Sequence, residues 1–324
     1  MIIVTGGSGF IGSAVVWRLN QLGEDNIVVV DRLGDTEKWR NLVGLKYADI
    51  FHKENFIELV LEDVVPFQVD AIIHLGACSS TTEKDADYLL HNNFKYTQAL
   101  AEFALEKGAR FIYASSAATY GDGSKGYFDD ETKLNELQPL NMYGYSKHMF
   151  DLWAQREGIA NEIVGLKYFN VYGPNEYHKG DMRSVVHKAF YQINETGKVK
   201  LFKSYKPEYK DGEQMRDFIY VKDAIDITLH FLENKNINGL FNAGTGKARS
   251  WIDLATALFN AMGLPVNIEF IEMPEQLKGK YQYFTEANIS KLRDAGYEKP
   301  ITTLENGVKD YVQNYLMNEK YLGS

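Results

Sequence analysis

The sequence predicts an α/β fold, in which a doubly wound parallel sheet is joined to a smaller, mostly C-terminal lobe. Between residues 1 and 170, short apolar runs alternate with amphipathic segments about six times, which is typical of parallel strands connected by helices. After Pro174 the sequence becomes polar and glycine-containing, which indicates that a second part begins there. We therefore expect residues 1–170 to form one domain and 171–324 mainly the other, with segments near 216–245 returning to the main sheet.

The composition is that of an ordinary globular protein. The 324 residues are 45% hydrophobic and 24% charged, which is enough for a full core. A net charge of −9 argues against nucleic-acid partners, which favour basic surfaces. The single cysteine, Cys78, excludes an intrachain disulfide, and we expect no metal site. The sequence has neither the ~18 consecutive apolar residues of a membrane span nor a signal segment, so a cytoplasmic protein is expected.

A glycine-rich loop directly follows the first apolar run, residues 1–5. Gly6, Gly9 and Gly12 are spaced three apart, and an amphipathic segment follows at residues 13–22. This spacing allows a tight turn, a close approach of the backbone to a pyrophosphate, and close packing of helix on strand. The free N–H groups at the start of the helix can then bind phosphates. We therefore expect the first domain to bind a dinucleotide.

The second predicted strand, residues 26–30, ends at an acid that bears on the choice of cofactor. Asp31 can accept a hydrogen bond from the 2′-hydroxyl of an adenosine ribose, which favours NAD. Arg32 follows directly and Lys38 is near in sequence, and cations at this place can hold the 2′-phosphate of NADP. These residues alone leave both cofactors open.

A predicted strand at residues 110–114 ends in two serines, Ser115 and Ser116. In an open parallel sheet, residues at the carboxyl ends of strands face the ligand crevice, so Ser116 can donate a hydrogen bond to a reacting oxygen. The alternative is that either serine caps a local turn or helix. Earlier elements of the same sheet are predicted as a third strand ending near 49–50, a strand and loop at 70–77, and a helix at 85–107.

Tyr143 and Lys147 lie four residues apart in a predicted helix, so their side chains share one face, one turn apart. A phenol is a poor base while its pKa stays near 10, and a nearby ammonium lowers that pKa. Such a pair can take a proton from an alcohol if another group accepts the hydride. The same spacing also occurs by chance on surface helices, so its meaning depends on the cofactor site.

The second half of the chain completes the sheet and adds the smaller lobe. A strand pattern at 162–168 runs into 170–174. Between Lys198 and Arg216 there are six Lys or Arg and three acidic residues, and a locally basic loop in an acidic protein can receive a diphosphate. Further strands are predicted at 216–221, 240–243 and 266–271, and further helices at 183–194, 223–233, 251–262, 286–293 and 303–316.

Taken together, Gly6-x-x-Gly9-x-x-Gly12, Ser116 and Tyr143-x-x-x-Lys147 resemble the extended short-chain dehydrogenase/reductase superfamily, over essentially the whole chain. The resemblance implies a Rossmann-like sheet and a place among nucleotide-sugar epimerases and dehydratases. Several stretches are similar to one branch in particular, the epimerases that act at C6 of an ADP-linked heptose for the lipopolysaccharide inner core. These stretches are 76–83, 113–121, 141–147, 169–174, 178–180 and 277–282.

The resemblance implies epimerisation by way of a transient ketone. Bound NADP oxidises C6 of the heptose and the hydride returns to the other face, so a proton donor or acceptor is needed on each side. Tyr143 is implied for one face and Lys179 for the other. Lys147 would lower the pKa of Tyr143 and hold the nicotinamide ribose, and Ser116 would bind the reacting oxygen. A flexible surface lysine is the alternative for Lys179.

The resemblance also implies contacts residue by residue, together with a homo-oligomer, typically a pentamer. The cofactor contacts are Gly6, Gly9, Phe10, Ile11, Gly12, Asp31, Arg32, Lys38, Lys53, Gly76, Ala77, Cys78, Ser79, Asn93 (in preference to Asn92), Lys147 and Val171. The substrate contacts are Ser116, Asn170, Lys179, Asp181, Lys188, Phe202, Arg216 and Tyr281, with Arg216 and the basic loop taking the diphosphate.

Four features depart from the pattern of that branch. Arg32 replaces a usual asparagine, which favours NADP. Asp181 stands where a small serine is common, and Lys188 stands where a substrate-contacting histidine is expected, with His187 one position away. The 205–214 loop is also longer than usual. These departures bear on substrate contacts more than on catalysis.

Three other functions share part of the pattern. A nucleotide-sugar dehydratase usually carries an Asp-Glu pair directly after the serine or threonine, where this chain has Ala117 and Ala118. A C4 epimerase of UDP-sugars explains the tyrosine and lysine pair but neither Lys179 nor residues 76–83. A non-catalytic NAD(P)-binding regulator usually lacks the tyrosine or the lysine, and both are present.

Overall fold

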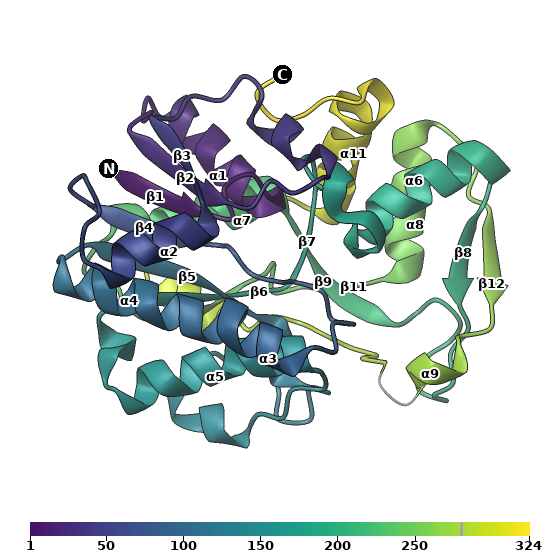
Figure 1. The fold of residues 1–324 in the computed structure, drawn as a ribbon. Helices are drawn as coiled ribbons and strands as arrows, with labels where there is room; N and C mark the ends of the chain where they lie inside the picture. The colour runs from purple at the N-terminus through teal and green to yellow at the C-terminus, as the bar shows by residue number, and fades with distance from the viewer. Residues whose placement is uncertain (279–280) are drawn as a thin grey trace.

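A computed structural model describes residues 1–278 and 281–324; residues 279 and 280, part of the 277–282 stretch noted above, lie outside the described residues. At its centre is a sheet of seven strands in the order β10-β6-β5-β4-β1-β2-β3, and every pairing in it is parallel (Figure 1). The order reverses after β1, which confirms the predicted doubly wound sheet. The strands are β1 (Ile2–Thr5), β2 (Ile27–Asp31), β3 (Asp49–His52), β4 (Ala71–His74), β5 (Arg110–Ser116), β6 (Val164–Tyr168) and β10 (Gly239–Ala243).

Helices cover both faces of the main sheet (Figure 1). Successive strand residues point to opposite faces, and both faces are apolar here, as a parallel sheet requires. Ile3 packs in one core cluster with residues of α2, α4 and α5, whereas Val4 packs in another with residues of α1 and α7. These helices are α1 (Phe10–Gln21), α2 (Lys53–Leu61), α4 (Tyr96–Glu106), α5 (Met142–Arg156) and α7 (Val221–Glu233).

The helix predicted at 85–107 is present but is not uniform. It begins as α3 (Ala86–Leu89), passes through a π-helical turn at Leu90–Lys95 and continues as α4. Such turns add a residue to the helix, and they are frequent at functional sites. The turn therefore changes which side chains of this segment face the sheet edge.

Two small sheets lie beside the main one. β7 (Asn170–Tyr172), β9 (Met215–Tyr220) and β11 (Ala248–Ser250) form one, in the order β11-β9-β7, and β8 (Val199–Phe202) pairs with β12 (Ile268–Ile271) in the other. The prediction that 216–221 returns to the main sheet is therefore wrong. β10 takes the place beside β6 and pairs with β6 along the whole length of β10. Of the strands predicted within 216–245, only the one at 240–243 therefore returns to the main sheet.

The rest of the chain carries the remaining helices. Most of them belong to the smaller lobe, which stands against one end of the sheet (Figure 1), but the helix at 290–294 packs against β10. The bounds of two predicted elements were wrong. The third strand begins at Asp49, where it was predicted to end, and the helix predicted at 286–293 begins only at Ser290. Within the described ranges, no helix is long and apolar enough to cross a membrane. The helices of this part are α6 (Val185–Thr196), α8 (Trp251–Met262), α9 (Glu275–Lys278), α10 (Ser290–Asp294) and α11 (Leu304–Asn314).

Candidate active site

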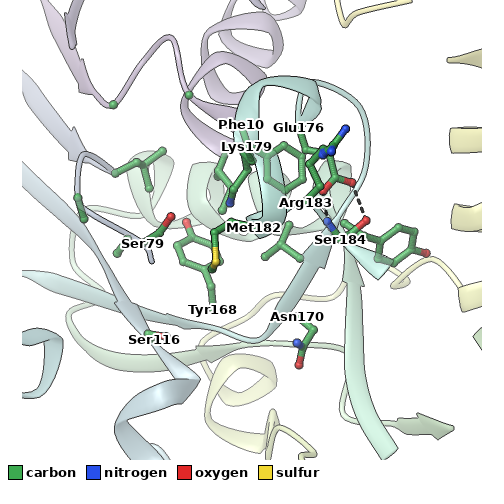
Figure 2. Close-up of a pocket in the computed structure, with 18 of the residues that line it drawn as sticks. Phe10, Ser79, Ser116, Tyr168, Asn170, Glu176, Lys179, Met182, Arg183 and Ser184 are labelled. Carbon is green, nitrogen blue, oxygen red and sulfur yellow. Dashed lines mark hydrogen bonds between the residues drawn. The ribbon is translucent and has the colours of Figure 1, made fainter. Parts of the chain in front are cut away.

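A cavity of about 660 Å³ opens at the carboxyl ends of β1, β4 and β5, where ligands bind in folds of this kind. Figure 2 shows the side chains around it. A smaller cavity of about 180 Å³ adjoins it, since Gly6, Asp31 and Lys38 line both. Of the residues singled out in the sequence, the two cavities are lined by Gly6, Gly9, Phe10, Ile11, Gly12, Asp31, Arg32, Lys38, Lys53, Gly76, Ala77, Cys78, Ser79, Ser116, Tyr143, Lys147, Asn170, Val171 and Lys179.

The glycine-rich loop forms a cradle that side chains would fill. Gly6 has a φ of +65°, and a Cβ there would lie 2.7 Å from the backbone nitrogen of Gly76. A Cβ on Gly12 would lie 2.1 Å from the carbonyl oxygen of Gly6. Gly9 is the N-cap of α1 and provides no side-chain cap, so the first N–H groups of the helix remain available to an anion. This cradle fits the pyrophosphate of a dinucleotide.

The carboxylate of Asp31 is already engaged by the protein. It accepts hydrogen bonds from the backbone nitrogen and hydroxyl of Ser8 at 2.9 and 2.6 Å, and the ammonium of Lys38 lies 2.6 Å away. Arg32 and Lys53 line the smaller cavity next to this carboxylate. Cations therefore gather where the sequence predicts the adenosine ribose.

The π-helical turn separates the roles of two neighbouring asparagines. Asn93 is fully buried, accepts from the N–H of Cys78 at 2.8 Å and donates to its carbonyl at 3.0 Å. Asn92 lines the smaller cavity and accepts a hydrogen bond from Lys53 at 2.6 Å. Asn93 is not among the residues that line either cavity. Asn93 therefore anchors the 76–79 loop, whereas Asn92 faces the smaller cavity.

Tyr143, Lys147 and Ser116 meet at one wall of the larger cavity. Asn141 caps α5 by accepting from the Gly144 N–H at 2.8 Å, which places Tyr143 in the first turn. Gly144 allows close approach to the neighbouring chain, because a Cβ there would lie 2.8 Å from the carbonyl oxygen of Ala118. The ammonium of Lys147 donates to the carbonyl of Ala114 at 2.8 Å.

Of the two alternatives considered for Ser116, the structure confirms the cap and leaves the binding role a prediction. Its hydroxyl oxygen accepts from the backbone N–H of Ala118 at 3.1 Å, so it caps the short 3-10 turn that follows β5. The cap uses only the hydroxyl oxygen, so the hydroxyl hydrogen can be donated towards the cavity, where Tyr143 is its neighbour. Ser116 also lines the cavity, and it can therefore bind a reacting oxygen there.

Burial governs the acidity of the tyrosine and lysine pair. It raises the pKa of Tyr143, and hydrogen bonding with Ser116 opposes this effect. It lowers the pKa of Lys147 to about 8, against the opposing charge of Asp151. The expected lowering of the Tyr143 pKa by Lys147 is therefore not seen, because desolvation of the phenolate outweighs other influences.

Lys179 reaches the cavity from a different element, the 3-10 segment Tyr177–Met182. Figure 2 shows its amine pointing into the cavity from above, with Ser116 below. The ammonium lies 5.4 Å from the centre of the Phe10 ring. Burial lowers the pKa of Lys179, and the carboxylate of Glu176 opposes that shift. A lysine with a lowered pKa is suited to proton transfer.

The predicted substrate contacts fall into three groups. Asn170 and Lys179 line the cavity. Phe202, Arg216 and Tyr281 form a cluster around Trp251, which itself lines the cavity. Asp181 and Lys188 are exposed, and the Lys188 ammonium donates to the Asp181 carbonyl at 3.2 Å. The structure brings the first two groups to the site and leaves the third outside the cavity wall.

Arg216 is the most distinctive member of that cluster. It is 7% exposed, and its guanidinium lies 5.1 Å from the ring centre of Tyr281 and 5.7 Å from that of Trp251. No ion pair joins it to a carboxylate of the described residues. A buried guanidinium without a counter-charge is suited to an anionic ligand.

Several cavity residues were missed in the sequence. They come from the chain before α6, from the end of β6 and from the smaller lobe, and no motif marks them. The one available signal is a serine directly before an amphipathic segment, which is typical of a helix N-cap. These residues are Tyr168, Glu176, Met182, Arg183, Ser184, Phe218 and Trp251.

The fold and the site define a Rossmann-like protein with a dinucleotide-binding cavity. The sequence matches the NAD dependent epimerase/dehydratase family over residues 2–244, and the chain belongs to that family. The cofactor is accordingly a nicotinamide dinucleotide, NAD(P).

Three proteins similar to this chain are epimerases of one kind. The chain is 60% identical to ADP-L-glycero-D-manno-heptose-6-epimerase of Nitratidesulfovibrio vulgaris strain Hildenborough over 316 residues, which cover 98% of each chain. It is 53% identical to the Fusobacterium nucleatum enzyme of the same name, over 98% of this chain and 99% of that one. The crystal structure of the Helicobacter pylori enzyme of that name matches with a TM-score of 0.82 and 30% identity, covering 97% and 95% of the two chains.

Proposed function

We propose that this protein is an isomerase that converts ADP-D-glycero-D-manno-heptose to ADP-L-glycero-D-manno-heptose, through a transient ketone at C6. The product supplies heptose for the inner core of lipopolysaccharide. The observation that carries the proposal is the presence of two separate proton-handling groups in one cavity, Tyr143 beside Ser116 and Lys179 on another element. The relatives at 60% and 53% identity support the choice of substrate.

In the proposed mechanism a bound nicotinamide would supply the hydride chemistry at C6, and the residues of this chain handle the proton of the C6 oxygen. Tyr143 exchanges the proton of the C6 oxygen on one face of the sugar, and Lys179 does so on the other. Ser116 donates a hydrogen bond to that oxygen and holds it near both groups. The carbon is inverted because the ketone turns over in the site, so that the hydride returns to its other face. A different residue then serves the oxygen in each of the two orientations.

NADP is the cofactor in this proposal. The Asp31 carboxylate is engaged by Ser8 and Lys38, so it is poorly placed to accept from a free ribose hydroxyl. The cations of Arg32, Lys38 and Lys53 beside the cavity suit a 2′-phosphate. Equilibrium binding of the two cofactors tests this choice directly. NADP should bind more tightly than NAD, and the Arg32→Asn variant should show a smaller difference between the two affinities.

The remaining assignments belong to the same proposal. Residues 1–170 mainly bind the cofactor and 171–324 mainly the substrate, with the ADP diphosphate on Arg216 and the sugar near Asn170. Phe202 and Tyr281 border the nucleotide. Asp181 and Lys188 are retained as outer contacts, although both are exposed. A cytoplasmic homo-oligomer, a pentamer by family resemblance, completes the proposal.

One experiment tests the function. The purified protein is incubated with ADP-D-glycero-D-manno-heptose in deuterated water, and both epimers are followed by NMR, with UDP-glucose as the control substrate. We expect the heptose epimers to interconvert without deuterium at C6, and UDP-glucose to remain unchanged. Deuterium at C6 would rule out hydride return, and turnover of UDP-glucose alone would rule out the substrate.

A further inference from the structure

A buried pair of charges lies directly behind the catalytic wall, and the proposed mechanism uses neither member. Asp151 on α5 and Lys167 on β6 are both 0% exposed at their side chains, and the ammonium lies 3.1 Å from the carboxylate. Neither residue lines the larger cavity. Burying two charges is costly, and an apolar pair of similar volume is often as stable. A gain in stability therefore does not explain why this charged pair is buried here.

The Asp151 carboxylate gathers polar groups from two neighbouring strands. It accepts hydrogen bonds from the hydroxyls of Tyr113 at 2.9 Å and Ser115 at 2.7 Å, both on β5. In the register of β5 and β6, Ser115 lies opposite Lys167, and Tyr113 lies opposite Gly165. A Cβ on Gly165 would lie 2.5 Å from the Tyr113 hydroxyl oxygen, so the glycine leaves room for this bond.

Lys167 reaches Ser116 from its other side. Its ammonium donates to the hydroxyl of Thr119 at 2.5 Å, and that hydroxyl donates to the carbonyl oxygen of Ser116 at 2.8 Å. The ammonium also lies 4.7 Å from the ring centre of Tyr120. Ser116 is thus held through Ser115 before it and through Thr119 after it, and both connections end at the buried pair.

The same carboxylate lies one helical turn beyond Lys147. The other groups near Lys147 come from several elements. His74 on β4 is within electrostatic reach of it, and Ser116, Cys78 and Tyr143 line the same cavity. Lys167 on β6 is paired with Asp151 itself. Burial lowers the pKa of Lys147, and the charge that opposes the shift is that of Asp151. Asp151 is thus the negative charge that favours the protonated ammonium, alongside the carbonyl oxygen of Ala114 that accepts from it at 2.8 Å.

We propose that Asp151 and Lys167 are positioning residues, which together fix Ser116 from both sides while Asp151 provides the negative charge that keeps Lys147 protonated. This inference rests on the roles of Ser116 and Lys147 in the proposed function. It explains why a charged pair is kept in the core. Asp151 and Lys167 would then act from a layer behind the cavity wall, without touching the substrate.

The test compares the holoenzyme with two variants, Asp151→Asn and the double variant Asp151→Asn/Lys167→Met, over a range of pH. We expect kcat to fall about tenfold or more in both, with the KM and the bound cofactor unchanged. The alkaline decline of kcat should move to lower pH by about one unit, because Lys147 loses its proton more readily. The double variant leaves no unpaired ammonium, so it keeps the measurement possible if the single variant folds poorly.

A matched control separates positioning from stability. Asp223 on α7 is also a buried carboxylate, accepts from Thr302 N and Oγ1 at 3.0 and 2.9 Å, and lies outside the cavity wall. Asp223→Asn should lower the melting temperature and leave the pH profile in place. If the Asp151 variants behaved in the same way, the inference would be overturned.

A milder variant tests the second half of the inference. Thr119→Val removes only the link from Lys167 to the Ser116 carbonyl, so kcat should fall several-fold without displacement of the pH profile. An unchanged kcat would overturn the link to Ser116. Failure of the proposed function itself would show differently, because the wild-type protein would then not interconvert the heptose epimers.

Discussion

The two sides of the cavity are built in different ways. Tyr143, Lys147 and Ser116 project from a long helix and a central strand, and the residues behind them are buried. Lys179 projects from a 3-10 segment that contains Gly180 in a non-helical conformation and is followed by the exposed Asp181. One side therefore belongs to the sheet, whereas the other is a loop.

The loop side is fixed by a carboxylate rather than by regular structure. Glu176 is 1% exposed and accepts hydrogen bonds from the N–H and the hydroxyl of Ser184, the N-cap of α6. These bonds tie together the two ends of the segment that carries Lys179. In each half of the site a buried carboxylate stands near a lysine of the cavity wall, Asp151 for the buried Lys147 and Glu176 for the half-buried Lys179. Both architectures thus place a carboxylate close to a cavity lysine.

The largest effect should come from removing the proton-handling group on each side. Tyr143→Phe and Lys179→Met should each slow interconversion of the epimers by about 10² to 10⁴, with the cofactor still bound. Because the proposed mechanism assigns the two residues to opposite faces of the sugar, the variants should fail with opposite epimers. Reduction of the bound cofactor by each pure epimer, followed by absorbance, measures this. If both variants failed with the same epimer, the two sides would not have separate roles.

The residues on the sheet side of the cavity could be predicted from local patterns in the sequence. The glycine spacing, the apolar strands and the carboxyl-end rule together located Gly6, Ser116 and the Tyr143–Lys147 pair, since each depends on local patterns of a repeated fold. The cofactor role of Asn93 stays a prediction. The structure shows its side chain bonded to the backbone of Cys78, and nothing local in the sequence marks the π-helical turn that sets which asparagine faces the cavity.

The loop side could not be derived in this way. Lys179 was singled out only by resemblance, and Glu176 was missed, because its role depends on contact with Ser184 eight residues away rather than on a period. The cluster around Arg216 depends on β9 leaving the main sheet, which was predicted wrongly. Long-range contacts of irregular segments leave no periodic trace in a sequence.

Glu176→Gln should weaken the loop side alone. The amide is a poorer acceptor for Ser184 and carries no charge for Lys179, so we expect a loss of about 1–3 kcal/mol in the free energy of unfolding. The Lys179-dependent half-reaction should fall about tenfold. Denaturant unfolding and single-epimer assays measure the two effects.

Asp253→Asn is the matched control for this variant. Asp253 accepts from the N–H of Ser250 at 3.0 Å in the capping box of α8, so it fixes a helix start as Glu176 does, but outside the cavity wall. It should reduce stability with little effect on either half-reaction. Equal rate losses in the two variants would mean that Glu176 acts only through stability.

Gly180→Ala should have a smaller effect on the same side. Gly180 has φ 53° and ψ −127°, and no atom lies within 4 Å of an added Cβ, so the cost is backbone strain of about 1–3 kcal/mol. Relief of that strain should displace Lys179 and lower kcat several-fold. Gly197→Ala is the control, since Gly197 also has a positive φ (70°) in open space but ends α6. An equal fall in kcat for both would show that the backbone of Gly180 has no special role.

The smallest effect on rate is expected at His187, which lies behind the loop side. It is 1% exposed, packs against Tyr177 and Tyr191, and neither ring nitrogen has a hydrogen-bond partner within the described residues. Burial lowers its pKa from 6.5 to about 4, so its contribution to stability is complete above pH 6.5 and is lost as the pH falls towards 4.

His187→Phe should remove that loss without changing kcat at neutral pH. The variant should gain about 2 kcal/mol of unfolding free energy relative to wild type between pH 7 and pH 5, as measured by denaturant unfolding at each pH. His178, whose pKa is also lowered by burial to about 4, is present in both proteins and cancels in the difference. A constant difference over that range would mean that His187 is protonated in the folded protein, and the loop side would then tolerate a buried charge without a carboxylate beside it.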